Sequence, residues 1–187
     1  MDPVRSDPKL GSLVDRHGDL PIGTADDEFE RLVVAIVNQQ LSTDSAAAIR
    51  ERLFDRVEVT PSGVLGADEA TLRDVGLSRQ KIEYVRNVAE AFRERDLTRE
   101  GLADADDEAV IATLTEIRGV GTWTAKMYLI FVLGRPDVFP VEDLGIRAGM
   151  AELYGFADGD RTAMVDHAER WRPYRSYASR YLWRAVD

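Results

Sequence analysis

The stretch of sequence that decides the fold is Leu114-Thr115-Glu116-Ile117-Arg118-Gly119-Val120-Gly121-Thr122-Trp123-Thr124-Ala125-Lys126. Its Gly-Val-Gly turn separates two segments of helical character, which predicts a helix–turn–helix hairpin over residues 114–126. Glycine adopts backbone conformations that other residues resist, and it lets another backbone come close. The free N–H groups at the start of the second helix form an anion site suited to one phosphate. Taken alone, such a turn fits an ordinary helix corner equally well.

Helical periodicity extends over nearly the whole chain on both sides of this hairpin. Apolar residues recur at helical spacing after polar or acidic starts, which favour helix N-termini. For the helix after Ser42, the predicted inward face is Ala46, Ile49, Leu53 and Phe54. Because period-two alternation is never sustained, the sequence predicts a single all-α domain over residues 1–187, with roughly ten helices.

Composition excludes several kinds of chemistry. The chain has no cysteine, which rules out disulfides, a cysteine nucleophile and an iron–sulfur cluster held by cysteines. His17 and His167 are the only histidines and lie far apart in sequence, so a histidine-based metal site or triad has little material. No apolar window is long enough to span a membrane, and the N-terminus lacks a signal-peptide pattern. We therefore expect a cytoplasmic protein.

The net charge of −10 argues, by itself, against a nucleic-acid partner, because phosphate binding draws on Lys and Arg. The acids are unevenly spread, however, and gather in predicted loops and helix starts. Residues 161–187 hold more arginines than acids. An acidic coat with a local basic face can still bind DNA, and it also suits a cytosol of high salt.

Two further segments carry candidate chemistry. In Val138-Phe139-Pro140-Val141-Glu142-Asp143-Leu144-Gly145-Ile146-Arg147, an apolar run that we expect to be a buried strand ends in two carboxylates at a helix start. An Asp there is commonly just a helix cap, worth about 1 kcal/mol. Residues 171–184 interleave aromatic and Arg side chains, which could sandwich a base and meet phosphates. Composition alone favours core aromatics and surface arginines.

Together, in this order and spacing, the three segments resemble the helix-hairpin-helix DNA glycosylase superfamily, and most closely its 3-methyladenine DNA glycosylase II branch. The resemblance runs from Phe29 to Trp183, and within that range it includes the segments 34–42 and 76–81. It implies a two-lobed helical bundle with a cleft between the lobes. One lobe would span about residues 29–110, and the other about 111–187 with the N-terminal helix.

The resemblance also implies roles for individual residues. Asp143, rather than Glu142, matches the catalytic aspartate. Trp123 and Trp183 would lie around the flipped base, and Met127 stands where relatives have a pocket tyrosine. The other implied residues are Gln40 and Leu41, which would insert into the duplex; Gly119, Gly121, Thr122 and Lys126, which would contact DNA at the hairpin; and Thr115, Ile117 and Val120, whose main-chain carbonyls would hold a structural sodium or potassium ion.

The function implied by the resemblance is hydrolysis of the N-glycosidic bond of alkylated bases, such as 3-methyladenine, in double-stranded DNA. Trp123 occupies the position of the lysine nucleophile in strand-cutting relatives, so we expect a monofunctional enzyme. We also expect a monomer that requires no cofactor and holds no iron–sulfur cluster. Two alternatives stay open: a glycosylase of the same fold for uracil, mismatched or oxidised bases, and a DNA-binding helix-hairpin-helix module without catalysis.

Overall fold

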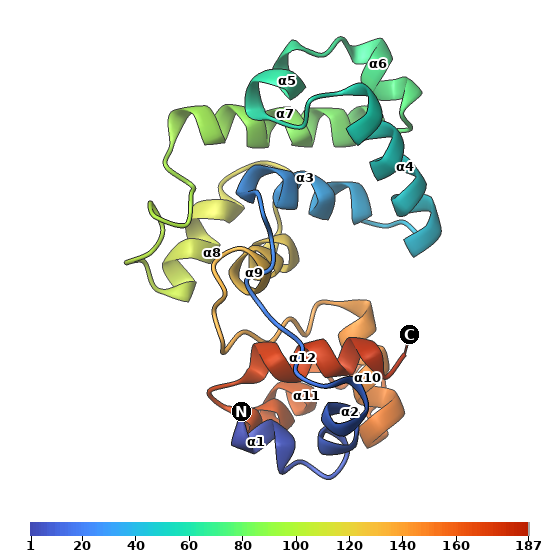
Figure 1. Ribbon diagram of the computed structural model, residues 1–187, viewed down its shortest axis with the longest axis vertical. Helices are drawn as coiled ribbons and strands as arrows, with labels where there is room; N and C mark the ends of the chain where they lie inside the picture. The colour runs from blue at the N-terminus through green and yellow to red at the C-terminus, as the bar shows by residue number, and fades with distance from the viewer. Residues whose placement is uncertain (187) are drawn as a thin grey trace. The chain divides into compact units, whose positions relative to one another are not determined.

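The computed structural model describes residues 1–186, in which helices are the only regular secondary structure (Figure 1). This confirms the all-α prediction. The expected strand over Val138–Val141 is instead irregular chain, with Val138, Phe139 and Pro140 buried. No helix among residues 1–186 is both long and apolar enough to cross a membrane.

The chain forms two compact units. Unit 1 consists of Met1–Thr24 together with the chain from Leu129 onward, and unit 2 is Ala25–Tyr128. The sequence placed this boundary after residue 110 instead, with the hairpin in the second lobe. The hairpin belongs to unit 2 because side chains of that unit hold it: Asn87 donates to the carbonyl of Arg118 at 3.0 Å, and Gln39 donates to that of Gly119 at 3.0 Å.

Unit 2 contains helices α3 to α8 and most of α9. Their bounds are α3 Glu28–Asn38, α4 Thr43–Arg56, α5 Pro61–Gly66, α6 Glu69–Asp74, α7 Arg79–Glu94, α8 Asp107–Thr115 and α9 Thr122–Phe131. Helix α7 packs against α3 and α5. Polar caps begin helices α3 to α8; for example, the side chains of Ser42 and Ser78 accept hydrogen bonds from Ser45 N and Lys81 N, as expected. The prediction that Phe54 lies on the inward face is wrong, since its side chain is 42% exposed.

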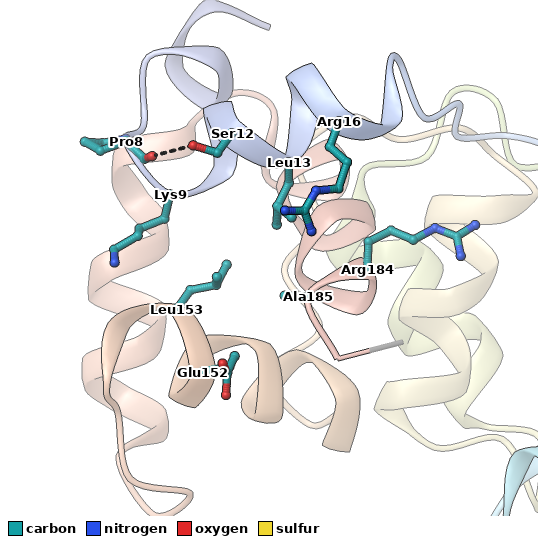
Figure 2. A pocket seen from close by; sticks show the side chains of 9 residues that line it. All are labelled: Pro8, Lys9, Ser12, Leu13, Arg16, Glu152, Leu153, Arg184 and Ala185. Carbon is teal, nitrogen blue, oxygen red and sulfur yellow. Dashed lines mark hydrogen bonds between the residues drawn. The ribbon is translucent and has the colours of Figure 1, made fainter.

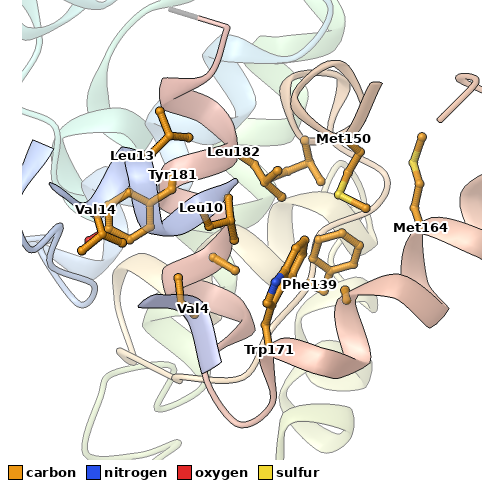
Figure 3. Close-up of a cluster of buried hydrophobic side chains, with 13 residues drawn as sticks. Val4, Leu10, Leu13, Val14, Phe139, Met150, Met164, Trp171, Tyr181 and Leu182 are labelled. Atoms are coloured by element: carbon orange, nitrogen blue, oxygen red, sulfur yellow. The ribbon is translucent and has the colours of Figure 1, made fainter. Parts of the chain in front are cut away.

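Unit 1 is built from the two chain termini. Its elements are α1 Asp2–Arg5, α2 Leu10–His17, α10 Leu144–Tyr154, α11 Arg161–Ala168, the 3₁₀ helix η1 Glu169–Trp171 and α12 Arg175–Arg184. A buried apolar cluster joins them (Figure 3). Within it the Phe139 and Trp171 rings meet edge to face, with centroids 6.1 Å apart. The cluster therefore anchors the chain just before the predicted catalytic segment.

A buried carboxylate ties the N-terminal helices to this cluster. Asp7 accepts hydrogen bonds from Tyr154 Oη at 2.7 Å and Trp171 Nε1 at 3.0 Å, and from the backbone N–H groups of Lys9 and Leu10. Burial acts to raise the pKa of Asp7, but these four bonds to the charged form bring it below the usual value. Residues from both ends of the chain thus form one unit.

Candidate functional site

The predicted catalytic aspartate begins α10. Asp143 is half-buried, and its Oδ1 accepts a hydrogen bond from Ile146 N at 3.0 Å, which makes it the N-cap of the helix. The same oxygen accepts a second hydrogen bond from Trp183 Nε1 at 2.8 Å. The structure therefore brings together two of the predicted site residues, which lie forty positions apart in sequence.

Two glycines let α12 come close enough for this contact. A Cβ on Gly149 would lie 2.4 Å from the carbonyl oxygen of Leu182, so α10 and α12 touch there backbone to backbone. A Cβ on Gly145 would lie 2.8 Å from Trp183 Cδ1 and 3.1 Å from Asp143 Oδ1. Any larger residue at position 145 would press on both partners of the hydrogen bond, a requirement that we did not predict from the sequence.

Trp183 is also held on its ring face. Its ring stacks on Phe131 with centroids 5.8 Å apart and planes 28° apart, and the guanidinium carbon of Arg180 lies 5.3 Å from the Phe131 ring centroid. Stacked aromatic pairs of this kind contribute about 0.5–1.5 kcal/mol beyond the area that they bury. Phe131 was missed in the sequence because it ends the hairpin's second helix as one apolar residue among several.

Arg147 fixes the main chain in front of Asp143. It is buried, its Nη1 donates to the carbonyls of Glu142 at 2.6 Å and Val141 at 3.3 Å, and its Nε pairs with Asp158 at 2.5 Å. The hydrogen bond and the charge of Arg147 lower the pKa of Asp158. Sequence alone could show an Arg four residues after the cap, but not which carbonyls it would reach.

The hairpin has two glycines with different environments. Gly119 has φ of +105°, and a Cβ there would lie 2.3 Å from Tyr84 Cγ, so the position requires glycine within the protein itself. Gly121 is exposed, and no atom lies within 4 Å of the place where its Cβ would be. Of the two glycines, only Gly121 has no protein atom near the place of an added Cβ.

The other predicted site residues in and beside the hairpin differ in exposure. Thr122 is exposed, Trp123 and Lys126 are half-buried, and Met127 is buried. The carbonyls predicted to hold a cation are those of Thr115, Ile117 and Val120, and the Ile117 carbonyl also accepts a hydrogen bond from Val120 N at 2.9 Å. The carbonyls between them, of Arg118 and Gly119, accept from side chains instead. Main-chain carbonyl oxygens are a ligand type that a hard cation takes.

The segment Gln39–Ser42 between α3 and α4 contains the residues predicted to enter the duplex. Gln40 is exposed and has φ of +57°, and Leu41 is 39% exposed. Gln39 points the other way: its Nε2 donates to Gly119 O at 3.0 Å and to Thr124 Oγ1 at 3.2 Å. This segment is therefore joined directly to the hairpin.

The arginines of the C-terminal segment are not all available to phosphates. Arg172 and Arg175 pair with Asp137 at 3.0 Å and 2.8 Å, and each also pairs with Glu169. Trp171 is fully buried in the core. The structural alternative raised by composition therefore holds for the core residue Trp171 and the exposed Arg172, whereas Arg175 is mostly buried.

A cavity in unit 1 lies apart from these residues. It measures about 320 Å³ and is lined by α2 together with the ends of α10 and α12 (Figure 2). Its lining combines basic Lys9 and Arg16 with acidic Glu152, and includes none of the predicted site residues.

Comparison with known proteins identifies relatives of this chain. The family model for the HhH-GPD superfamily base excision DNA repair protein matches residues 33–173. DNA-3-methyladenine glycosylase 1 of Schizosaccharomyces pombe is 34% identical over 163 residues, which are 83% of this chain and 71% of that protein. The Bacillus subtilis protein YfjP, whose name also includes "DNA-3-methyladenine glycosylase", is 29% identical over 95% of this chain and 66% of its own length.

A solved structure extends the likeness to the whole fold. The S. pombe 3-methyladenine DNA glycosylase Mag1, in complex with abasic DNA, superposes with a TM-score of 0.88 at 31% identity. The match covers 98% of this chain and 94% of that one. The chain therefore belongs to the HhH-GPD superfamily of base excision DNA repair proteins.

Proposed function

We propose that this protein is a monofunctional DNA glycosylase of the 3-methyladenine type, which releases alkylated bases from double-stranded DNA with Asp143 as its catalytic carboxylate. One observation carries the assignment of Asp143. At the start of α10, its carboxylate accepts a hydrogen bond of 2.8 Å from Trp183 of α12. The relatives named for 3-methyladenine support the substrate class.

The mechanism follows from the chemistry of an alkylated purine. A stacked base hides its glycosidic bond, so the nucleotide must first leave the duplex, which costs a few kcal/mol. N-alkylation makes the purine cationic, and a cation departs without a general acid. The base leaves with the bonding electron pair, and the sugar develops positive charge until water adds to it, which gives the abasic site and releases a proton. A half-buried carboxylate stabilises that charge more strongly than an exposed one does.

The hydrogen bonds of Asp143 have a catalytic use in this scheme. Trp183 Nε1 and Ile146 N both donate to Oδ1, and this fixes the orientation of the carboxylate before substrate arrives. Arg147 holds the two preceding carbonyls, so the main chain of the segment is fixed as well. A preorganised charge avoids the cost of reorienting during the reaction.

Base selection falls to aromatic side chains. Trp183 and Trp123 would contact the flipped base, and an indole face attracts a cationic ring by about 0.5–2 kcal/mol. Selection would then depend on the charge of the damaged base rather than on a hydrogen-bond pattern. Because Trp123 stands in place of a lysine nucleophile, no Schiff base forms and the abasic strand stays intact.

DNA binding falls to unit 2. The N–H groups at the start of α9 would meet one phosphate beside Gly121, with Thr122 and Lys126 nearby in sequence. Gln40 and Leu41 would fill the space that the flipped nucleotide leaves. The carbonyls of Thr115, Ile117 and Val120 would hold a sodium or potassium ion, which would add positive charge beside that phosphate.

A release assay tests the function. Three matched duplexes would carry a single methylated purine, a uracil or an oxidised guanine. We expect release from the methylated duplex, an unbroken abasic strand and no adduct after borohydride treatment. Preferential release of uracil or oxidised guanine would show a different substrate class, and a borohydride-trapped adduct would contradict the monofunctional mechanism.

A further inference from the structure

The conformation of Gln40 has a cost that the surrounding structure must offset. Its φ of +57° lies in the left-handed region, and in residues other than glycine such conformations persist only where neighbouring groups determine them. Both the Gln40 side chain and that of Leu41 are exposed, so these side chains do not hold the turn. The groups that do hold it act on the main chain before Gln40.

Lys81 supplies two of these restraints. Its Nζ donates to the carbonyl of Val37 at 2.6 Å and to that of Gln39 at 2.8 Å. These carbonyls lie at the C-terminal end of α3, where the last carbonyls lack helical partners and the helix dipole favours a cation. An ammonium group has three donors, and two of them bring these carbonyls to one point.

The position of Lys81 is itself well defined. Burial lowers its pKa, so a charged ammonium is costly there unless strong acceptors surround it. Ser78 caps α7 by accepting from Lys81 N at 3.2 Å, which fixes the first turn from which the side chain extends. Lysine is also rare in this chain: its only lysines are Lys9, Lys81 and Lys126.

The hairpin restrains the same turn from another direction. Gln39 donates to Gly119 O and to Thr124 Oγ1, and Thr124 is buried. The carbonyl of Gln39 is thus held by Lys81 while its side chain is held by the hairpin. With both ends of Gln39 fixed, the next residue has little freedom in its main chain.

We propose that Lys81 is a positioning residue for DNA distortion: it holds the main chain of Val37–Gln39 so that Gln40 stays exposed in its left-handed conformation, ready to enter the duplex. Lys81 acts through Gln40 and does not touch the reacting atoms. This inference rests on the proposed function, since it gives Gln40 a use only if the protein opens a duplex.

The test is a comparison of paired and unpaired lesions. Lys81→Met keeps most of the length of the side chain and removes its charge, and Lys9→Met, on a different unit, is the control. Single-turnover release would be measured from a duplex with a methylated purine and from the same purine in a single-stranded bulge, which needs no wedge. Because Lys81→Met removes two charge-assisted hydrogen bonds, it should slow release from the duplex about tenfold. Release from the bulge should fall less than about twofold.

A double variant shows whether the effect passes through Gln40. In a Gln40→Ala background, Lys81→Met should cause little further loss, because the wedge is already absent. Equal losses on paired and bulged lesions, additive losses in the double variant, or a wild-type rate for Lys81→Met would each overturn the proposal. If Lys81→Met fails to fold, Lys81→Arg, which keeps the cation, serves instead and should give a smaller loss with the same preference for paired lesions.

A binding readout separates this proposal from the proposed function. 2-Aminopurine beside an abasic site brightens when a wedge unstacks it, and this requires no catalysis. The wild-type protein should brighten the probe and Lys81→Met should not, even at saturating protein. If the wild type releases no methylated base but the two proteins still differ in this way, the proposed function fails and the role of Lys81 stands. An equal signal from both proteins overturns the role of Lys81.

Discussion

The main chain before Asp143 and the main chain before Gln40 are restrained in the same way, but the two restraints serve different purposes. In each, a buried or half-buried cation on a helix binds two main-chain carbonyls: Arg147 binds those of Val141 and Glu142, and Lys81 binds those of Val37 and Gln39. The side chain of Asp143 is also restrained, because Trp183 Nε1 and Ile146 N donate hydrogen bonds to it.

The side chain of Gln40, in contrast, is exposed, and the restraints act on the main chain. The difference matches the two tasks that we propose. A carboxylate that stabilises charge must be oriented before the reaction, whereas a side chain that enters a duplex must stay free of intramolecular partners. Substitutions at each of the two segments should therefore have different effects.

The largest effect is expected from Asp143→Asn. Asparagine keeps an oxygen that can accept from Trp183 and from Ile146 N, so the cap and the fold should survive. Only the negative charge is lost, and base release should fall by roughly 100-fold or more. Single-turnover release and a thermal melt of the same sample check both halves. Near-wild-type turnover would remove Asp143 from the mechanism.

Gly145→Ala should have the next largest effect. The added Cβ would lie 2.8 Å from Trp183 Cδ1 and 3.1 Å from Asp143 Oδ1, so the tryptophan must move and its hydrogen bond lengthen. We expect about a tenfold loss of release rate, the equivalent of one hydrogen bond to a charged group. Gly159→Ala is the matched control, because nothing lies within 4 Å of its Cβ position. Equal rates for both variants would show that the Trp183 contact is dispensable.

The two hairpin glycines should separate stability from binding. Gly119→Ala places a Cβ 2.3 Å from Tyr84 Cγ at a φ of +105°, so it should lower the free energy of unfolding by about 1–3 kcal/mol. Gly121→Ala meets nothing in the protein and should leave the melting temperature unchanged while weakening affinity for an abasic duplex about fivefold. A destabilised Gly121→Ala would mean that the hairpin fails as a protein element before DNA is involved.

Local patterns in the sequence predicted the helices, their caps and the role of Asp143 as a cap, because those depend on neighbours a few residues away. The contacts that orient the site were not predictable in this way. Gly145 matters only because α12 brings Trp183 beside it, and Lys81 matters only because α7 lies along the end of α3. The unit boundary was misplaced for the same reason, since Gln39 and Asn87 fix the hairpin over long distances in sequence.

The smallest effect concerns salt, and it tests how unit 2 binds phosphate. Counterion release makes the logarithm of affinity fall with the logarithm of salt concentration, with a slope of about −0.9 for each phosphate neutralised by Lys or Arg. Backbone N–H groups at α9 neutralise none. Several arginines are also occupied by acids, as Arg172, Arg175 and Arg118 are by Asp137, Glu169 and Glu83.

The net charge of −10 adds a long-range repulsion of DNA, which salt screens within about 10 Å at 0.1 M. Both effects flatten the salt dependence. We expect a slope nearer to −1 than to −5, so that affinity for an abasic duplex changes about fourfold when salt is raised fourfold. Fluorescence anisotropy across a salt series measures it, with Lys126→Met to reveal the contribution of one lysine. A slope of about −5 or steeper, as for six phosphate contacts, would mean that a basic face of side chains, and not the hairpin backbone, dominates binding.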